Sequence, residues 1–113
     1  MLSQKHRLLK KKDFDRVFKK GKGVKQNFLF MKWAKNDLPV SRFGFIVGKK
    51  TSKKAPLRNK IKRRMREIIR ANLSRIEKGI DIVFISRAGL TKNSFSQLEE
   101  NIKTAFKKSK IFQ

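Results

Sequence analysis

A dense basic segment with a helical apolar period, residues 49–70, constrains this chain more than any other feature. It reads KKTSKKAPLRNKIKRRMREIIR and holds eleven Lys and Arg against one acid, Glu67. Apolar side chains recur at helical spacing and fall within one arc of roughly 160° on a helical wheel. They are Leu57, Ile61, Met65, Ile68, Ile69, Leu73 and Ile76. The segment therefore predicts a helix with a core face and a cationic face, with Pro56 in its first turn.

The cationic face predicts a surface that binds polyanions. Asn59, Arg63, Arg66 and Arg70 cluster opposite the apolar arc, with Lys60 and Arg64 on one flank and Arg58 and Lys62 near the other margin. A solvated helix flank usually mixes charges of both signs, yet Glu67 is the only acid between Lys49 and Arg75. Phosphate backbones are the commonest partners of such a face.

The overall charge favours the same class of partner. The chain has 32 basic and 8 acidic residues, a net charge of +24, which repels itself unless a counter-charged partner is present. A generically basic soluble protein is the alternative. No apolar run approaches the ~20 residues that span a bilayer. Residues 1–12, MLSQKHRLLKKK, have no apolar stretch and are therefore not expected to be a secretory signal. The absence of cysteine fits a reducing compartment, and we expect a cytoplasmic protein.

The remaining sequence predicts one α+β domain, residues 1–113, in the order α-β-β-β-α-β-α, with helices packed on a central sheet. Residues 1–12 are expected to form a basic, flexible arm. Asp13 is expected to cap a short helix whose apolar face is Phe14, Val17 and Phe18. Strands are expected over 23–26, 27–34 and 42–48, with the last two paired across the turn at 36–39.

The C-terminal half predicts a buried strand and a last helix. Gly79 is expected to close the basic helix, and residues 80–86, IDIVFIS, are apolar on both alternations, which predicts a strand buried on both faces. Ser94 and Gln97 have the spacing of a capping box. The last helix is expected to bury Phe95, Leu98, Ile102, Ala105 and Phe106.

The sequence predicts no catalytic residues and no metal ligands. His6 is the only histidine, and no carboxylate pair has spacing that suggests a metal or general acid–base site. Phe14 and Phe18, beside Arg16, could stack on single-stranded bases, at roughly 1–3 kcal/mol per base. Ordinary core packing of a short helix is the alternative, and the residues alone favour it.

Two motifs together resemble the bacterial ribonuclease P protein component. Residues 55–67, APLRNKIKRRMRE, look like the signature basic helix of that family, and residues 8–22, LLKKKDFDRVFKKGK, are similar to its N-terminal segment. The ending DIVFISRAGL, followed by a helix, also matches in order and spacing. Lys60 stands in place of the second Arg of the signature, which keeps the charge but loses the planar fork of a guanidinium.

The resemblance implies a left-handed βαβ crossover and a role in a ribonucleoprotein endonuclease. Ribonuclease P removes the 5′ leader of precursor tRNA, its RNA subunit is the catalyst, and Mg²⁺ is held mainly by that RNA. The implied partners are ribonuclease P RNA and precursor tRNA, with no membrane and no small-molecule substrate. A structural ribosomal or nucleoid protein without enzymatic assembly is the alternative.

The resemblance also assigns roles to individual residues. RNA binding falls on Arg58, Asn59, Lys60, Lys62, Arg63 and Arg66, to which the charge pattern adds Lys49, Lys50 and Arg70. Leader binding falls on Phe14 and Phe18, with Arg16 beside them.

Overall fold

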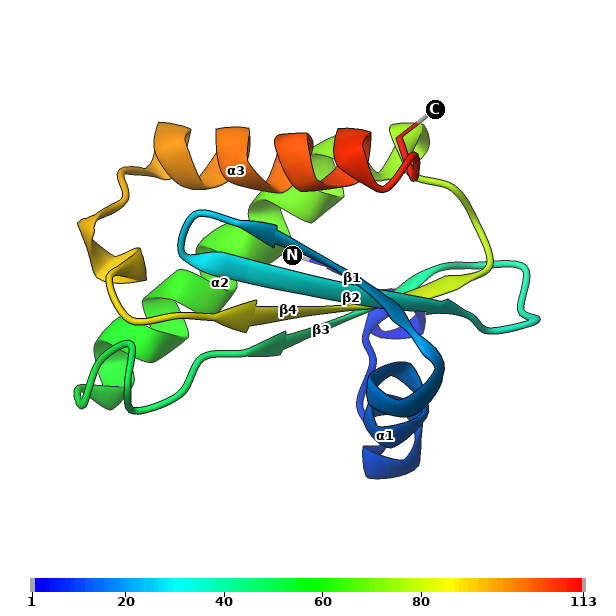
Figure 1. Cartoon of the computed structure of the whole chain (residues 1–113), viewed down its shortest axis with the longest axis horizontal. Coiled ribbons are helices and arrows are strands. Elements are labelled where there is room, and N and C mark those ends of the chain that lie inside the picture. The colour runs from blue at the N-terminus through cyan, green and yellow to red at the C-terminus, as the bar shows by residue number, and fades with distance from the viewer. Residues whose placement is uncertain (1, 113) are drawn as a thin grey trace.

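The computed structural model describes residues 2–112, which form helices on both sides of one sheet (Figure 1). The elements are η1 (Gln4–His6), α1 (Lys11–Lys20), β1 (Lys22–Gln26), β2 (Leu29–Lys35), β3 (Arg42–Ile46), α2 (Ala55–Asn72), η2 (Leu73–Arg75), β4 (Ile80–Ser86), η3 (Leu90–Lys92) and α3 (Phe95–Lys108), where η marks a short 3-10 helix. The predicted α-β-β-β-α-β-α order is confirmed.

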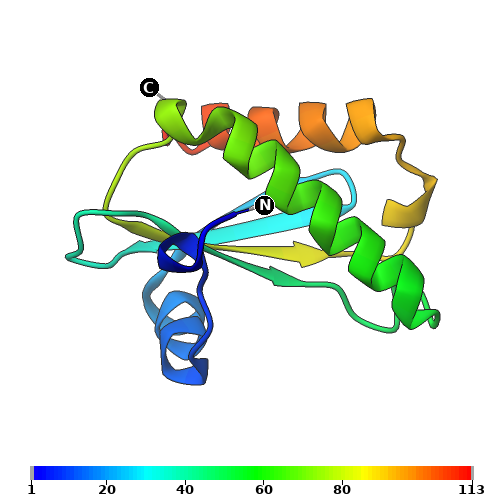
Figure 2. The ribbon, with the colours of Figure 1, turned by 180° about the vertical axis from the view of Figure 1, so that it is seen from behind.

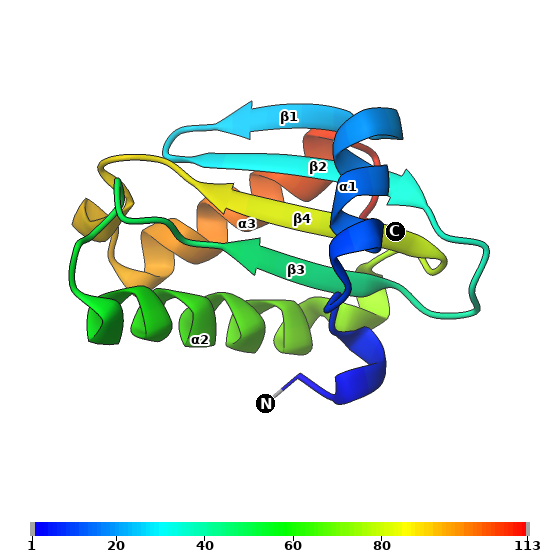
Figure 3. The same cartoon turned by 90° about the horizontal axis from the view of Figure 1, so that it is seen from below.

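The strands form a mixed sheet in the order β1-β2-β4-β3. β2 pairs antiparallel with both β1 and β4, whereas β3 pairs parallel with β4. The expected pairing of β3 with the strand before it is wrong, because β4 lies between them. β4 has apolar side chains on both of its faces. A central position in the sheet buries the side chains of both faces, which explains why β4 lies between β2 and β3. The connection from β3 through α2 to β4 is left-handed, as the resemblance implied (Figure 3).

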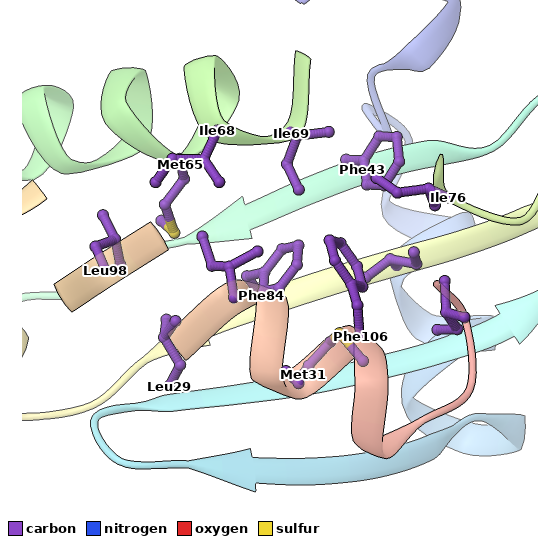
Figure 4. Close-up of a cluster of buried hydrophobic side chains, with 14 of the residues drawn as sticks. Leu29, Met31, Phe43, Met65, Ile68, Ile69, Ile76, Phe84, Leu98 and Phe106 are labelled. Atoms are coloured by element: carbon purple, nitrogen blue, oxygen red, sulfur yellow. The ribbon is translucent and has the colours of Figure 1, made fainter. Parts of the chain in front are cut away.

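The two faces of the sheet are covered unequally. α2 and α3 lie across one face, and α1 crosses one end of the opposite face (Figures 1 and 2). The main core fills the space beneath α2 and α3, where Met65 and Ile68 of α2 meet Phe84 of β4 and Phe106 of α3 (Figure 4). A smaller cluster of Leu8, Val17 and Val83 lies beneath α1.

α2 buries the face that its period predicted. Ile61, Met65, Ile68 and Ile69 are all at most 6% exposed. The helix ends at Asn72, whose side-chain amide donates to the carbonyl of Ile68 (2.8 Å). Gly79 therefore does not close the helix, as was expected. It lies in the turn before β4 with φ of 80°, a conformation that favours glycine.

α3 begins with the predicted capping box. The Ser94 hydroxyl accepts from the Gln97 amide, and the Gln97 side chain accepts from the Ser94 amide. Leu98, Ile102, Ala105 and Phe106 are buried as expected. Burial of Phe95 was wrongly expected: it is 43% exposed, because the first helical position precedes the stretch that contacts the sheet.

The N-terminal arm differs from the expected flexible segment. Leu2 and Leu8 are 2% and 3% exposed, and the amide of Leu8 donates to the carbonyl of Phe43 (2.9 Å). Nδ1 of His6 lies 2.8 Å from the carbonyl oxygen of Ser41. α1 begins at Lys11 after Lys10, so Asp13 lies in its first turn and is not the cap. The arm thus packs along the edge of β3.

Candidate nucleic-acid interface

The exposed side of α2 carries the predicted cations. Asn59, Lys60, Arg63 and Arg70 are exposed there, opposite the buried arc. Arg70 lies 3.7 Å from Glu67, a weak surface pair that leaves the guanidinium accessible. Arg58, Lys62 and Arg66 follow one another at intervals of four residues and are half-buried. Lys62 and Arg66 lie beside Gly44 and Phe45 of β3, so the expected place of Arg66, opposite the apolar arc, is wrong. The nine predicted RNA-binding residues therefore divide into an exposed group and a half-buried row.

The loop that precedes α2 is anchored at one buried residue. Thr51 is 8% exposed, and its hydroxyl lies 2.6 Å from the hydroxyl of Ser86 at the end of β4. The guanidinium of Arg58 donates to the carbonyl of Ser52 (3.0 Å), which joins the loop to the first turn of α2. Lys49 and Lys50 are exposed beside this anchor. The two lysines thus extend the cationic surface of α2, and we call the nine residues together the basic surface.

α1 is held on the sheet by a buried carboxylate that the sequence analysis did not identify. Asp81 of β4 is 0% exposed. Its oxygens accept from Arg16 of α1, from Arg42 Nε (2.9 Å) and Nη2 (2.7 Å), and from the Asn36 amide (2.8 Å). The hydrogen bond to Asp81 and then the negative charge of that carboxylate raise the pKa of Arg42, although burial opposes them. Asp81 thereby connects α1, β3 and β4.

The guanidinium of Arg16 already has two partners within the protein. Its guanidinium pairs with Asp81 and also donates to the carbonyl of Lys35 (2.6 Å). The side chain lines a hollow with Trp33 and Lys20, and it is absent from the hollow that contains Phe14. The structure therefore gives Arg16 a positioning contact, and its predicted role in leader binding stays a prediction.

Phe14 and Phe18 lie between the sheet and solvent. Both are half-buried and pack against the small cluster beneath α1. The ring of Phe14 sits on Gly44 of β3, where an added Cβ would lie 2.6 Å from it. Lys32 donates to the carbonyl of Phe18 (3.0 Å), and its ammonium lies 5.9 Å from the centre of that ring. Each ring has one side in the core and another available to a ligand.

Figure 3, seen from below, shows that α1 crosses one end of this face of the sheet and that no other helix among the described residues covers the rest of the face. Strand pairing places Lys25, Phe30, Ile85 and Ile46 side by side across the four strands. Ile46 is 36% exposed, and Phe30 and Ile85 are half-buried. Together with Phe14 and Phe18 this row forms the open sheet face. The sequence analysis did not identify Phe30, which lies on this face, whereas its neighbour Met31 is 1% exposed in the core.

The basic surface and the open sheet face meet at one hollow. Its lining includes Phe14 of α1, Gly44 and Phe45 of β3, and Lys62 and Arg66 of α2. Arg66 also lies over the Phe45 ring, 5.9 Å from its centre. A chain of phosphates and unpaired bases could pass from one surface to the other without leaving contact with cations or rings.

Two features are absent from the part of the chain that the structure describes. Within residues 2–112 no three His, Asp or Glu side chains lie close enough together to hold a metal ion. No helix in the same range is long and apolar enough to cross a membrane. What the structure does present at this interface is a surface of cations and rings.

Known proteins share this sequence and fold. A family model described as Ribonuclease P matches residues 2–110. The ribonuclease P protein component of Syntrophomonas wolfei is 38% identical over 112 residues, which cover 99% of this chain and 93% of that protein. The component of Thermotoga maritima is 41% identical over 90 residues, 80% of this chain and 76% of that protein.

Solved structures agree with the sequence matches. The RNase P protein of Staphylococcus aureus has a TM-score of 0.88 at 32% identity and covers 96% of this chain and 98% of its own. The RNase P protein of Thermotoga maritima has a TM-score of 0.82 at 37% identity and covers 90% and 96%. The match spans the arm, α1, the sheet and α2 alike, and the chain therefore belongs to the Ribonuclease P family of protein components.

Proposed function

We propose that this chain is the protein subunit of a ribonuclease P that holds two RNA strands at once. The catalytic RNA binds the basic surface, and the 5′ leader of precursor tRNA binds the open sheet face. The observation that carries the proposal is the hollow where Phe14 meets Lys62 and Arg66, because it joins the two surfaces. A leader held there lies next to the RNA that cleaves it.

Binding of the catalytic RNA follows from the charge of the basic surface. It comprises Lys49, Lys50, Arg58, Asn59, Lys60, Lys62, Arg63, Arg66 and Arg70. Each phosphate that these cations neutralise releases condensed counterions, so affinity falls steeply with salt. The surface stands on a helix whose opposite face is fixed in the core by Met65 and Ile69, both 0% exposed. The core contacts therefore fix the backbone from which the cations of α2 extend.

Leader binding follows from the rings of the open sheet face. Phe14 and Phe18 are positioned by packing against Val83 and by the Asp81 contacts that hold α1. Bases can stack on such rings, or riboses can pack against them, at roughly 1–3 kcal/mol per base. Lys25 at the β1 end of the row and Lys32 beside the row can contact phosphates. Stacking of this kind needs unpaired bases, and the 5′ leader, which mature tRNA lacks, would supply them.

Mg²⁺ belongs, in this proposal, to the RNA. The carboxylates of the chain do not fit a metal site, since Asp81 is already engaged by two guanidiniums and an amide. Phosphates of the RNA partner would hold the ion, which supplies activated water and stabilises the leaving oxygen when bound. The protein contributes positive charge that screens repulsion between phosphates, together with contacts that position the leader.

Reconstitution tests the proposal directly. The protein with Mg²⁺ alone is expected to leave precursor tRNA intact, and addition of the cognate large RNA is expected to give cleavage at a lower Mg²⁺ concentration than the RNA needs by itself. Sustained site-specific cleavage by RNA-free protein would contradict the proposal. A structural nucleic-acid-binding protein would instead bind precursor and mature tRNA alike and leave the Mg²⁺ requirement unchanged.

A further inference from the structure

Arg7 occupies a fixed position at the edge of the sheet. The arm bridges to β3 at Phe43, and the buried Leu8 follows immediately. The guanidinium of Arg7 donates through Nε to the carbonyl of Leu2 (3.0 Å), while Leu2 is itself 2% exposed in the core. Arg7 is therefore held by the folded arm, with its remaining donors free to meet a ligand.

Arg7 lies close enough to a second guanidinium to affect its charge. Burial lowers the pKa of Arg66, and the positive charge of Arg7 lowers it further. Neither arginine takes part in the ion pairs that Arg16, Arg42 and Arg70 make with carboxylates. Two guanidiniums that repel each other cost stability in the free protein, and an anion placed between them removes that cost.

The two arginines share the hollow at the β3 edge. It measures about 260 Å³, with Lys62 as a third cation and the rings of Phe14 and Phe45 beside them. Its floor at Gly44 is bare backbone, on which the Phe14 ring rests. Planar guanidiniums suit the oxygens of a phosphate, and adjacent rings suit unpaired bases.

We propose that Arg7 and Arg66 jointly bind one backbone phosphate of single-stranded RNA in this hollow, next to Phe14. The inference rests on the proposed function and adds a residue of the arm to it. The phosphate belongs either to the leader of precursor tRNA, continuing from Phe14, or to an unpaired stretch of the catalytic RNA, continuing from Lys62. Both sources present the same phosphodiester.

The test uses the holoenzyme reconstituted from the full chain and its cognate RNA. The variants are Arg7→Gln, Arg66→Gln and the double variant, and Lys11→Gln is the control, because Lys11 is exposed, lies outside the hollow and changes the net charge equally. Three affinities are measured over a range of salt: that of the holoenzyme for precursor tRNA, that of the holoenzyme for mature tRNA, and that of the protein for catalytic RNA. Melting temperatures of the free proteins are measured in parallel.

Each single variant is expected to weaken one of these affinities by roughly two- to tenfold relative to the control. Because both arginines contact the same phosphate, the double variant should lose little more affinity than either single variant. The slope of log affinity against log salt concentration should fall by about 0.7 in total, as for one lost phosphate contact, and not by that amount for each arginine. Loss confined to precursor tRNA identifies the leader as the source, and loss confined to catalytic RNA identifies the other strand. Arg7→Gln removes the hydrogen bond to Leu2 and also the repulsion from Arg66, so its melting temperature should stay close to that of the Lys11→Gln control.

Two results would overturn the inference. One is that folded Arg7→Gln protein has the same affinities as the Lys11→Gln control. The other is additive loss, with two equal decreases in slope, which would mean two separate phosphates. Should Arg7→Gln fail to fold, Arg7→Lys keeps the charge without the fork, and full affinity in that variant would also exclude a guanidinium-specific site. The proposed function fails separately, if wild-type holoenzyme does not distinguish precursor from mature tRNA.

Discussion

Replacement of Asp81 by Asn removes the charge that holds α1 on the sheet. Asp81 is 0% exposed, and four side-chain donors from Arg16, Arg42 and Asn36 converge on its two oxygens. Asn has nearly the same shape but only one acceptor oxygen and no charge. Two guanidiniums would remain beside a neutral group, in a chain whose net charge is already +24.

We expect the free energy of unfolding to fall by about 3 kcal/mol. A hydrogen bond to a charged group contributes roughly 1.5–3 kcal/mol, and Asn can keep about half of the four contacts. The side chains of Arg16 and Arg42 are 29% and 21% exposed, so water recovers part of the loss. The total then lies near the lower end of the ~3–5 kcal/mol typical of breaking a buried pair. The melting temperature should fall by roughly 10–20 °C.

Urea denaturation followed by circular dichroism measures this loss. Asp15→Asn is the matched control, because Asp15 is exposed on the same helix and its replacement changes the net charge identically. The control should change stability by no more than about 0.5 kcal/mol. Adding Arg16→Gln to Asp81→Asn should restore part of the loss, since one unpaired charge is then gone. Equal stability of Asp81→Asn and Asp15→Asn would refute the idea that this carboxylate holds α1.

Two further substitutions test the open sheet face and the basic surface in turn. Gly44→Ala would place a Cβ 2.6 Å from the Phe14 ring. We therefore expect a loss of about 1–3 kcal/mol in stability and weaker binding of precursor tRNA but not of mature tRNA. Gly48→Ala is the control in both assays, because nothing lies within 4 Å of its added carbon. Thr51→Val removes the hydroxyl that lies 2.6 Å from Ser86, so we expect a loss of about 1–3 kcal/mol, faster amide exchange over residues 48–54 and weaker binding of catalytic RNA, whereas Thr51→Ser should retain wild-type behaviour.

The parts of the fold that the sequence predicted depend on local periodicity. The core face of α2 follows from apolar residues at helical spacing, and the capping box of α3 follows from Ser94 and Gln97 three residues apart. The strand partner of β3 depends instead on β4, a later segment that takes the central position between β2 and β3. Pairing of consecutive strands is more frequent among known proteins, but it does not occur here between β2 and β3. The double-sided apolar pattern of β4 was the signal that could have placed it centrally.

The candidate site was predictable only in its cations. The basic surface is visible as a charge pattern, but the open sheet face arises because α1 covers one end of the sheet and leaves Phe30, Ile46 and Ile85 uncovered. Strand alternation cannot tell which face a distant helix covers. Asp81, a lone acid in an apolar strand, was a usable signal for buried cation partners. The anchoring of the arm depends on Leu2 and Leu8 finding apolar partners far along the chain.

The division of the two RNA strands between the two surfaces is tested most directly by one crossed measurement on Phe18→Ala and Arg63→Ala. For each variant, affinity for catalytic RNA and the ratio of precursor to mature tRNA affinity in the holoenzyme are determined at a temperature where the protein is folded. Phe18→Ala should reduce precursor binding by roughly 1–3 kcal/mol and leave mature tRNA and catalytic RNA unaffected. Arg63→Ala should weaken catalytic RNA binding, lower its salt slope by about 0.9 or less, and leave the tRNA ratio unchanged. If both variants lost both affinities to the same extent, the two surfaces would not bind separate strands.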